Sequence, residues 1–192
     1  MVKCDAGSAS TMIDADCKCH LLIEDYSVET ENSTSIKCVF SVLAATDASQ
    51  VGKRQTEYFP CEGKAVDKLY NLAEAVGIIT HDQRRKAAEG GVDLDIDETL
   101  LKGRQCCAEI KMEPNMRRNA ATGTMEVNPE KPGPYPKIGF RTFAVTSDKA
   151  KDVPKDPQFL ALLGKQAAAP SQPAAPAAPQ QAPPADAGEM TW

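Results

Sequence analysis

The sequence predicts a mainly β domain over residues 1–164, followed by a disordered tail over residues 165–192. Three observations lead to this prediction. Apolar and polar side chains alternate in several segments, and one segment alone carries a strong helical repeat. After Lys165, Pro, Ala and Gln dominate a low-complexity run that offers no apolar face to bury. A chain of 192 residues suits one such domain with a substantial core.

Two neighbouring segments are expected to form an antiparallel pair of strands. In residues 16–29, Cys17, Cys19 and Leu21 share one face of an extended chain. A polar turn leads into residues 35–43, where every second side chain is apolar, as a strand with one buried face requires. These inward-facing residues are Ile36, Cys38, Phe40 and Val42.

A third strand is expected at residues 53–59, and the clearest helix follows at residues 64–76. The apolar side chains of this helix recur at helical spacing and would pack on the sheet, with Gly77 as the C-terminal cap. A shorter, exposed helix is expected at residues 81–89. The apolar stripe of the longer helix consists of Val66, Leu69, Leu72, Ala73 and Val76.

Two further strands are expected at residues 104–112 and 137–145. The connection between them, residues 113–136, is long, polar and rich in Gly and Pro, which is typical of functional or mobile loops. Asp156 and Pro157 supply the cap and first turn of a short closing helix. Five strands with one helix between the third and the fourth is the order of an OB-type barrel, whose loops and strand face bind oligonucleotides.

Charge and cysteine content narrow the classes of protein that fit. A net charge of −5 and a sequence pI near 5.1 argue against a polycation that binds duplex DNA through bulk charge. The seven cysteines are an odd number without the regular spacing of a secreted disulfide framework, which favours a reducing compartment. No apolar stretch approaches the ~20 residues of a membrane span, and no signal peptide is recognised, so no membrane association is expected.

Metal-dependent chemistry is a weaker alternative. Cys17, Cys19 and His20 could join Cys106 and Cys107 in a zinc site, but no Cys-x-x-Cys knuckle exists, so structural cysteines and no metal are expected.

An enzyme is the other alternative with named residues. Glu109 and Lys111 on one strand, with Asp95 or Asp97 upstream, are similar to the acid-x-lysine arrangement of metal-dependent nucleases. Such short motifs are frequent by chance, and no phosphate loop or dinucleotide fingerprint is found, so neither catalysis nor a cofactor is expected.

Short motifs along residues 12–146 carry a family resemblance. They are the strand at residues 31–43, Gly52-Lys53-Arg54, Glu57-Tyr58-Phe59, the helix end at residues 69–78, and Leu101-Lys102-Gly103-Arg104. Together they resemble phage and prophage single-stranded DNA-binding proteins, some of which are still classed as a domain of unknown function. The resemblance implies an OB-type fold and a role in DNA replication or recombination, in the cytoplasm of a bacterial host cell.

Cationic and aromatic side chains are the candidates for DNA contact, because single-strand binders combine basic grooves with rings on which bases stack. The candidates are Lys53, Arg54, Tyr58, Lys111, Arg117, Arg118, Tyr135, Lys137, Arg141 and Phe143. The alternative for any one of them is that Phe143 belongs to the core and that the cations form a solvated face. We therefore expect sequence-tolerant single-stranded DNA binding. A virion or host-interaction protein without a nucleic-acid role is the second hypothesis.

The tail is expected to recruit replication or recombination proteins. Its end resembles the acidic tip of bacterial single-strand binding proteins, because Asp186 and Glu189 flank Met190 and Trp192 beyond a proline-rich linker. An exposed Trp supplies the apolar anchor that binding sites favour. An inert solubilising tail is the alternative, and the sequence leaves open whether copies of the chain form a homo-oligomer.

Overall fold

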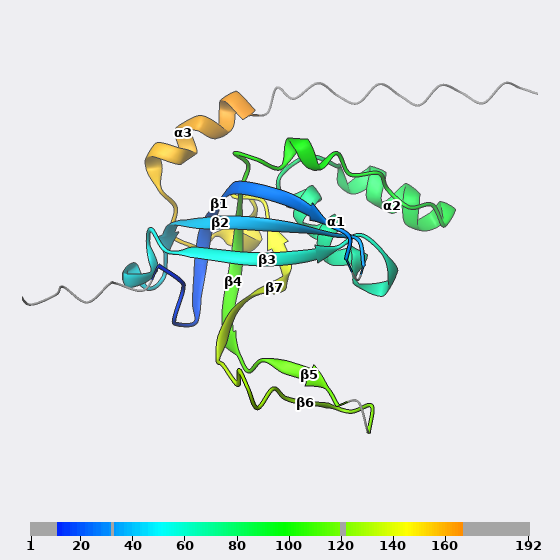
Figure 1. The fold of residues 1–192 in the computed structure, drawn as a ribbon. Coiled ribbons are helices and arrows are strands. Elements are labelled where there is room, and N and C mark those ends of the chain that lie inside the picture. The colour runs from blue at the N-terminus through cyan, green and yellow to red at the C-terminus, as the bar shows by residue number, and fades with distance from the viewer. Residues whose placement is uncertain (1–10, 32, 120–121, 167–192) are drawn as a thin grey trace, which may run out of the picture.

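A five-stranded antiparallel sheet forms the centre of this computed structural model, which describes residues 11–31, 33–119 and 122–166, with the backbone only for residues 163–166. The strands follow the order β3-β2-β1-β4-β7 across the sheet (Figure 1). Their bounds are β1 Cys17–Glu29, β2 Ser35–Ala45, β3 Arg54–Pro60, β4 Gln105–Glu113 and β7 Tyr135–Phe143. The prediction of a mainly β domain with five principal strands is confirmed.

The core lies on the inner face of this sheet, where the alternating apolar side chains point. Leu21, Phe40 and Phe59 are fully buried there, and the rings of Phe40 and Phe59 lie 6.1 Å apart. The pairing of β1 with β2 shifts register twice, between His20 and Leu21 and between Ile23 and Asp25. Such bulges bend a strand and increase its twist, so β1 curves across the sheet and does not follow a straight line.

The helix α1, Val66–Ala75, covers the core with the stripe that the sequence predicts, since Leu69, Leu72 and Ala73 are buried. It starts two residues later than expected because residues Gly63–Ala65 form a 3-10 turn. The second helix, α2, His81–Gly90, buries none of its residues, also as predicted. No helix in the described ranges is long and apolar enough to cross a membrane.

The two edge strands, β3 and β7, face each other without a backbone ladder, so the predicted barrel is not closed. Two side chains of β3 bridge the gap: Gln55 Nε2 donates to the carbonyl of Pro136 at 2.8 Å, and Glu57 Oε2 accepts from the Ile138 N–H at 2.9 Å. Pro136 has no N–H to give to a neighbouring strand, which is a physical reason for the missing ladder. Lys68 of α1 holds the other Glu57 oxygen at 2.8 Å.

The long connection between β4 and β7 differs from the irregular loop that the sequence suggests. It contains a hairpin of β5, Met116–Arg118, and β6, Met125–Val127, which we call the β5–β6 arm. The arm projects away from the five-stranded sheet, below it in Figure 1. An isolated two-stranded hairpin is marginally stable in water, so the arm is a candidate for contact with a ligand or partner.

The chain after β7 returns over the outer face of β1 and β4. Val145, Ala150 and Val153 are buried there against Cys107, with half-buried Phe143 beside them. The last described helix, α3, Pro157–Gln166, begins where the sequence predicts, and Asp156 accepts from the Gln158 N–H at 2.8 Å.

A buried histidine fixes this C-terminal segment to the sheet. The ring of His20 is fully buried; its Nδ1 accepts from the Asp156 N–H at 3.2 Å and its Nε2 donates to Gln105 Oε1 at 2.9 Å. Gln105 Nε2 in turn donates to the carbonyl of Phe159 at 3.2 Å. The contact with the Asp156 N–H requires an unprotonated Nδ1, and burial lowers the pKa of His20 below its usual value of 6.5.

We therefore expect His20 to make the fold acid-sensitive. Between the lowered folded-state pKa and 6.5 the unfolded chain binds more protons, so the contribution of His20 is present above pH 6.5 and is lost as the pH falls. Thermal unfolding between pH 7 and pH 5 should show a steeper loss of stability for the wild type than for His20→Gln. His81→Gln is the matched control, because the His81 side chain is 79% exposed. Equal slopes for wild type and His20→Gln would contradict the assignment.

Candidate nucleic-acid interface

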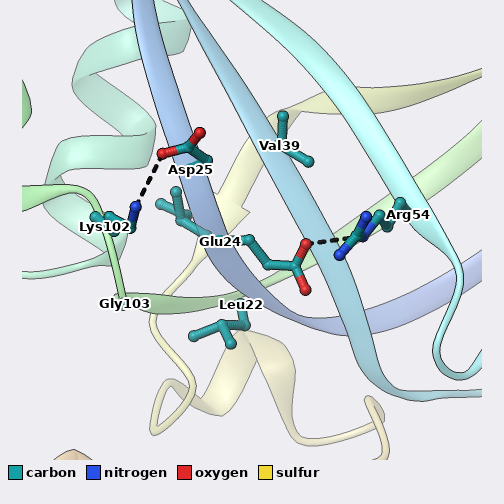
Figure 2. Close-up of a pocket in the computed structure, with 8 residues that line it drawn as sticks. Leu22, Glu24, Asp25, Val39, Arg54, Lys102 and Gly103 are labelled. Carbon is teal, nitrogen blue, oxygen red and sulfur yellow. Dashed lines mark hydrogen bonds and ion pairs between the residues drawn. The ribbon is translucent and has the colours of Figure 1, made fainter.

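The outer face of β1, β2 and β3 carries a shallow open groove (Figure 2). Side chains reach it because they alternate with the core residues along each strand, and because the β1 bulge turns two consecutive acidic residues outward. The residues that line it include Leu22, Glu24, Asp25, Val39, Arg54 and Lys102.

The two cations that line this groove are each paired with a carboxylate. Arg54 Nε lies 2.9 Å from Glu24 Oε2, across β2, and Lys102 Nζ lies 3.1 Å from Asp25 Oδ1 (Figure 2). The hydrogen bond from Lys102 lowers the pKa of Asp25. These groups are solvent-exposed, so the pairs are weak and exchangeable, and a phosphate can compete for the same cations.

An exposed aromatic ring lies farther along the same face of β3. Tyr58 projects from the outer side of β3 and is 46% exposed. Its neighbour across the ladder is Lys37, whose Nζ lies 5.8 Å from the ring centre and 3.2 Å from Glu29. The hydrogen bond to Glu29 raises the pKa of Lys37. This arrangement offers a flat stacking surface with a positive charge at its side.

Of the three candidates around the β2–β3 hairpin, Arg54 lines this groove, and Tyr58 lies on the same outer side of β3. The ammonium group of Lys53 is 2.7 Å from Asp14, and its side chain is only 16% exposed. The hydrogen bond from Lys53 lowers the pKa of Asp14. Lys53 therefore fastens the segment that precedes β1 and is poorly placed to receive a phosphate.

The candidates on β4 and β7 form a second group near the base of the β5–β6 arm. Lys111 and Lys137 are partners across the β4–β7 ladder, and both are exposed. Lys111 is 3.7 Å from Glu109 of its own strand. Tyr135, at the start of β7, is 38% exposed.

On the arm, Arg117 and Arg118 point to opposite faces of the hairpin. Arg117 pairs with Glu126 at 3.1 Å, and Arg118 Nε donates to the carbonyl of Gly123 at 3.0 Å. The face that carries Arg118 also presents three exposed apolar side chains that the sequence did not single out. They are Met116, Met125 and Val127.

The last two candidates lie elsewhere. Arg141 and Phe143 line a different groove, between α1 and the end of β7, and Phe143 also packs on the small cluster around Cys107. The ten candidates thus fall into separate groups and do not form one continuous site. The proposed tail tip, Asp186, Glu189, Met190 and Trp192, lies outside the described residues.

The six cysteines of the described residues do not converge on one point. Cys17 and Cys19 share the inner face of β1, with their sulfurs 3.1 Å apart, whereas Cys107 lies in the cluster on the outer face. Burial raises the pKa of Cys107 to about 11 and that of Cys38 to about 12, which keeps these thiols protonated. Within the described ranges, no three His, Cys, Asp or Glu side chains are grouped to hold a metal ion.

Two of the acidic residues of the nuclease alternative have other partners in the structure. Glu109 is paired with Lys111 on the outer side of β4. Asp97 accepts from the backbone N–H of Thr99 at 3.0 Å and caps a 3-10 turn, Glu98–Leu100.

The sequence-based candidates do not include two cations, Lys37 beside Tyr58 and Lys102 in the groove. Lys37 alternates with the inward residues of β2, so its outward position could have been read from the pattern. Lys102 lies in the turn before β4, and its approach to Asp25 depends on the β1 bulge, which left no signal in the sequence. Neither a protein-family model nor a curated protein matches this chain.

Proposed function

We propose that this chain has an OB-type fold and binds single-stranded DNA with little sequence preference. The sheet order β3-β2-β1-β4-β7 with α1 between β3 and β4 supports the fold, because OB-type barrels are five-stranded and partly open. The side chains of Gln55 and Glu57, which join β3 to β7, take the place of a closing ladder.

The observation that carries the proposal is the exposed ring of Tyr58 beside Lys37 on the outer face of β2 and β3. In OB-type proteins that face, with the loops between the first two and the last two strands, receives the nucleic acid. Here the loop between the last two principal strands contains the β5–β6 arm, which carries Arg117 and Arg118. Tyr135 follows this loop as the first residue of β7. Bases would stack on Tyr58 while phosphates follow the cations.

When DNA binds to this surface, its phosphates would replace the carboxylates as partners of the cations. Phosphates would take Arg54, Lys102 and Lys37 from their carboxylates, so the acidic side chains tune affinity downward and oppose nonspecific adhesion of a chain with net charge −5. The motif resemblance to phage single-stranded DNA-binding proteins supports a role in replication or recombination in a bacterial cytoplasm. Within this proposal, the C-terminal tip recruits the protein partners.

Fluorescence anisotropy with labelled oligo-dT tests the proposal. Affinity should fall with salt, with a log–log slope of about −0.7 for each phosphate contact. Absent or salt-independent binding would reject it and favour the virion or host-interaction alternative. Release of nucleotides in the presence of magnesium would favour the nuclease alternative.

The partner exchange predicts that Glu24→Gln binds oligo-dT more tightly, because it frees Arg54. Exposed pairs are worth about 0.2–1 kcal/mol, so we expect about a one-and-a-half- to fivefold gain at low salt that shrinks at high salt. Asp82→Asn on α2 makes the same charge change away from the groove and is the control. Equal gains in oligo-dT affinity for the two variants would show that net charge alone explains the gain, and would contradict a role for the Glu24–Arg54 pair.

A further inference from the structure

A second groove lies between α1, the first turn of α2 and the end of β7. It is lined by Asn71, Glu74, His81, Arg84, Arg141 and Lys149 at polar positions, with Ala75, Phe143 and Ala144 as apolar contacts. None of these residues lines the groove on β1–β3.

The charge balance of this groove is positive. Three cations, Arg84, Arg141 and Lys149, stand against one carboxylate, Glu74. That carboxylate is already engaged on both oxygens, by His81 at 3.0 Å and by Arg84 at 3.2 Å. In a chain with net charge −5, a cluster of cations around a saturated carboxylate is a local exception.

Two of the cations differ from those on the β1–β3 face. Among the described residues, no ion pair is found for the side chains of Arg141 and Lys149, whereas Arg54 and Lys102 each hold a carboxylate. Arg84 is fixed by three acceptors, since it also bonds Asn71 at 2.7 Å and Asp67 at 3.1 Å. The groove thus combines one immobilised guanidinium with two cations that are available to an anion.

Further groups in the wall suit an oxyanion. The hydroxyl oxygen of Thr142 is buried without a hydrogen-bond partner, a state that often marks an unobserved water, ion or ligand. The ten-residue helix α2 begins at His81, in the wall of the groove, and the positive end of its dipole favours negative charge there. A guanidinium fork with an ammonium group is the usual protein partner of phosphate.

We propose that this groove is a phosphate-binding site, with Arg141 and Lys149 as the principal ligands and Arg84 as a fixed positive wall. The ligand class is a phosphate group, either free or carried by a nucleotide chain. The site is separate from the surface assigned to single-stranded DNA, and it stands whether or not that surface binds DNA.

Titration of the ¹⁵N-labelled full-length chain with inorganic phosphate, followed by NMR, tests this site. Saturable shifts are expected at the amides of residues 81–84 and 141–149, without comparable shifts at Arg54 and Tyr58. Arg141→Gln combined with Lys149→Gln should weaken the apparent affinity at least fivefold. The control combines Lys86→Gln with Lys151→Gln, which removes two exposed cations outside the groove. Non-saturating shifts, or equal losses in both double variants, would overturn the proposal.

Oligo-dT with and without a 5′-phosphate identifies the source of the phosphate. Groove shifts with the phosphorylated oligonucleotide alone assign a strand terminus, and equal shifts assign the backbone. A response to inorganic phosphate only assigns a free ligand. The two proposals fail separately: loss of groove shifts removes the phosphate site, whereas oligo-dT that leaves the β2 and β3 amides unchanged removes the DNA-binding face.

Discussion

Replacing Glu57 with alanine is expected to lower the free energy of unfolding by about 3 kcal/mol. Glu57 is only 8% exposed, and its two oxygens hold the Ile138 N–H of β7 and the ammonium group of Lys68. The alanine variant leaves both donors without their acceptor in the seam between β3 and β7. Breaking a buried pair costs more than the pair contributes, because the remaining charge is unpaired.

Urea unfolding of three variants checks this prediction. Glu57→Gln keeps an acceptor for the Ile138 N–H but removes the charge that faces Lys68, so its loss should be intermediate. Glu62→Ala, at an exposed position whose side chain caps no helix, should change stability by less than about 0.5 kcal/mol. If Glu57→Ala matches Glu62→Ala, the seam is not held by this side chain.

The same strand explains what the sequence could and could not predict about the fold. The strands and α1 follow from alternation and from the helical spacing of residues such as Leu69 and Leu72, which local patterns report. Gln55 and Glu57 lie at every second position before Phe59, so the alternation places all three side chains on the inner face of β3. A buried polar side chain is unfavourable unless it has a hydrogen-bond partner, and the sequence does not show those partners. Their partners lie 81 residues away, on β7.

The arm and the bulge were missed for a related reason. The strands of the β5–β6 arm are three residues long, too short for alternation to be distinguished from chance. The β1 bulge leaves no mark in composition, although it brings Asp25 to Lys102. Both features depend on contacts between distant parts of the chain and not on a local sequence pattern.

The sequence predicted part of the candidate site, because it identified suitable residue types. It did not predict which residues pair with them. Arg54 and Tyr58 were identified because cations and rings interleave along β3, and both lie on the outer side of that strand. Lys53 has the same local signature, but its neighbour Asp14 comes from a segment 39 residues earlier. No partner for His20 was evident in the sequence, because Gln105 is 85 residues distant. Charge pairing over such separations is decided by the fold.

Replacing Tyr58 with alanine is expected to weaken oligo-dT binding by about 1–3 kcal/mol, which is about five- to 150-fold, if the ring stacks a base as proposed. Tyr58 is exposed on the outer side of β3 and takes no part in the core cluster, so its loss should leave stability almost unchanged. The salt slope should also stay constant, because no phosphate contact is removed.

Tyr58→Phe separates stacking from hydrogen bonding. It keeps the aromatic face beside Lys37, so affinity within about twofold of the wild type is expected. A second control, Lys37→Gln, removes a cation next to the same ring and should lower both the affinity and the magnitude of the salt slope. The two side chains thus have distinguishable effects. Loss of the ring lowers the affinity at a constant salt slope, whereas loss of the lysine lowers both the affinity and the magnitude of the salt slope. If Tyr58→Ala binds oligo-dT with wild-type affinity, the proposed stacking of bases on Tyr58, and with it the DNA-binding proposal, is contradicted.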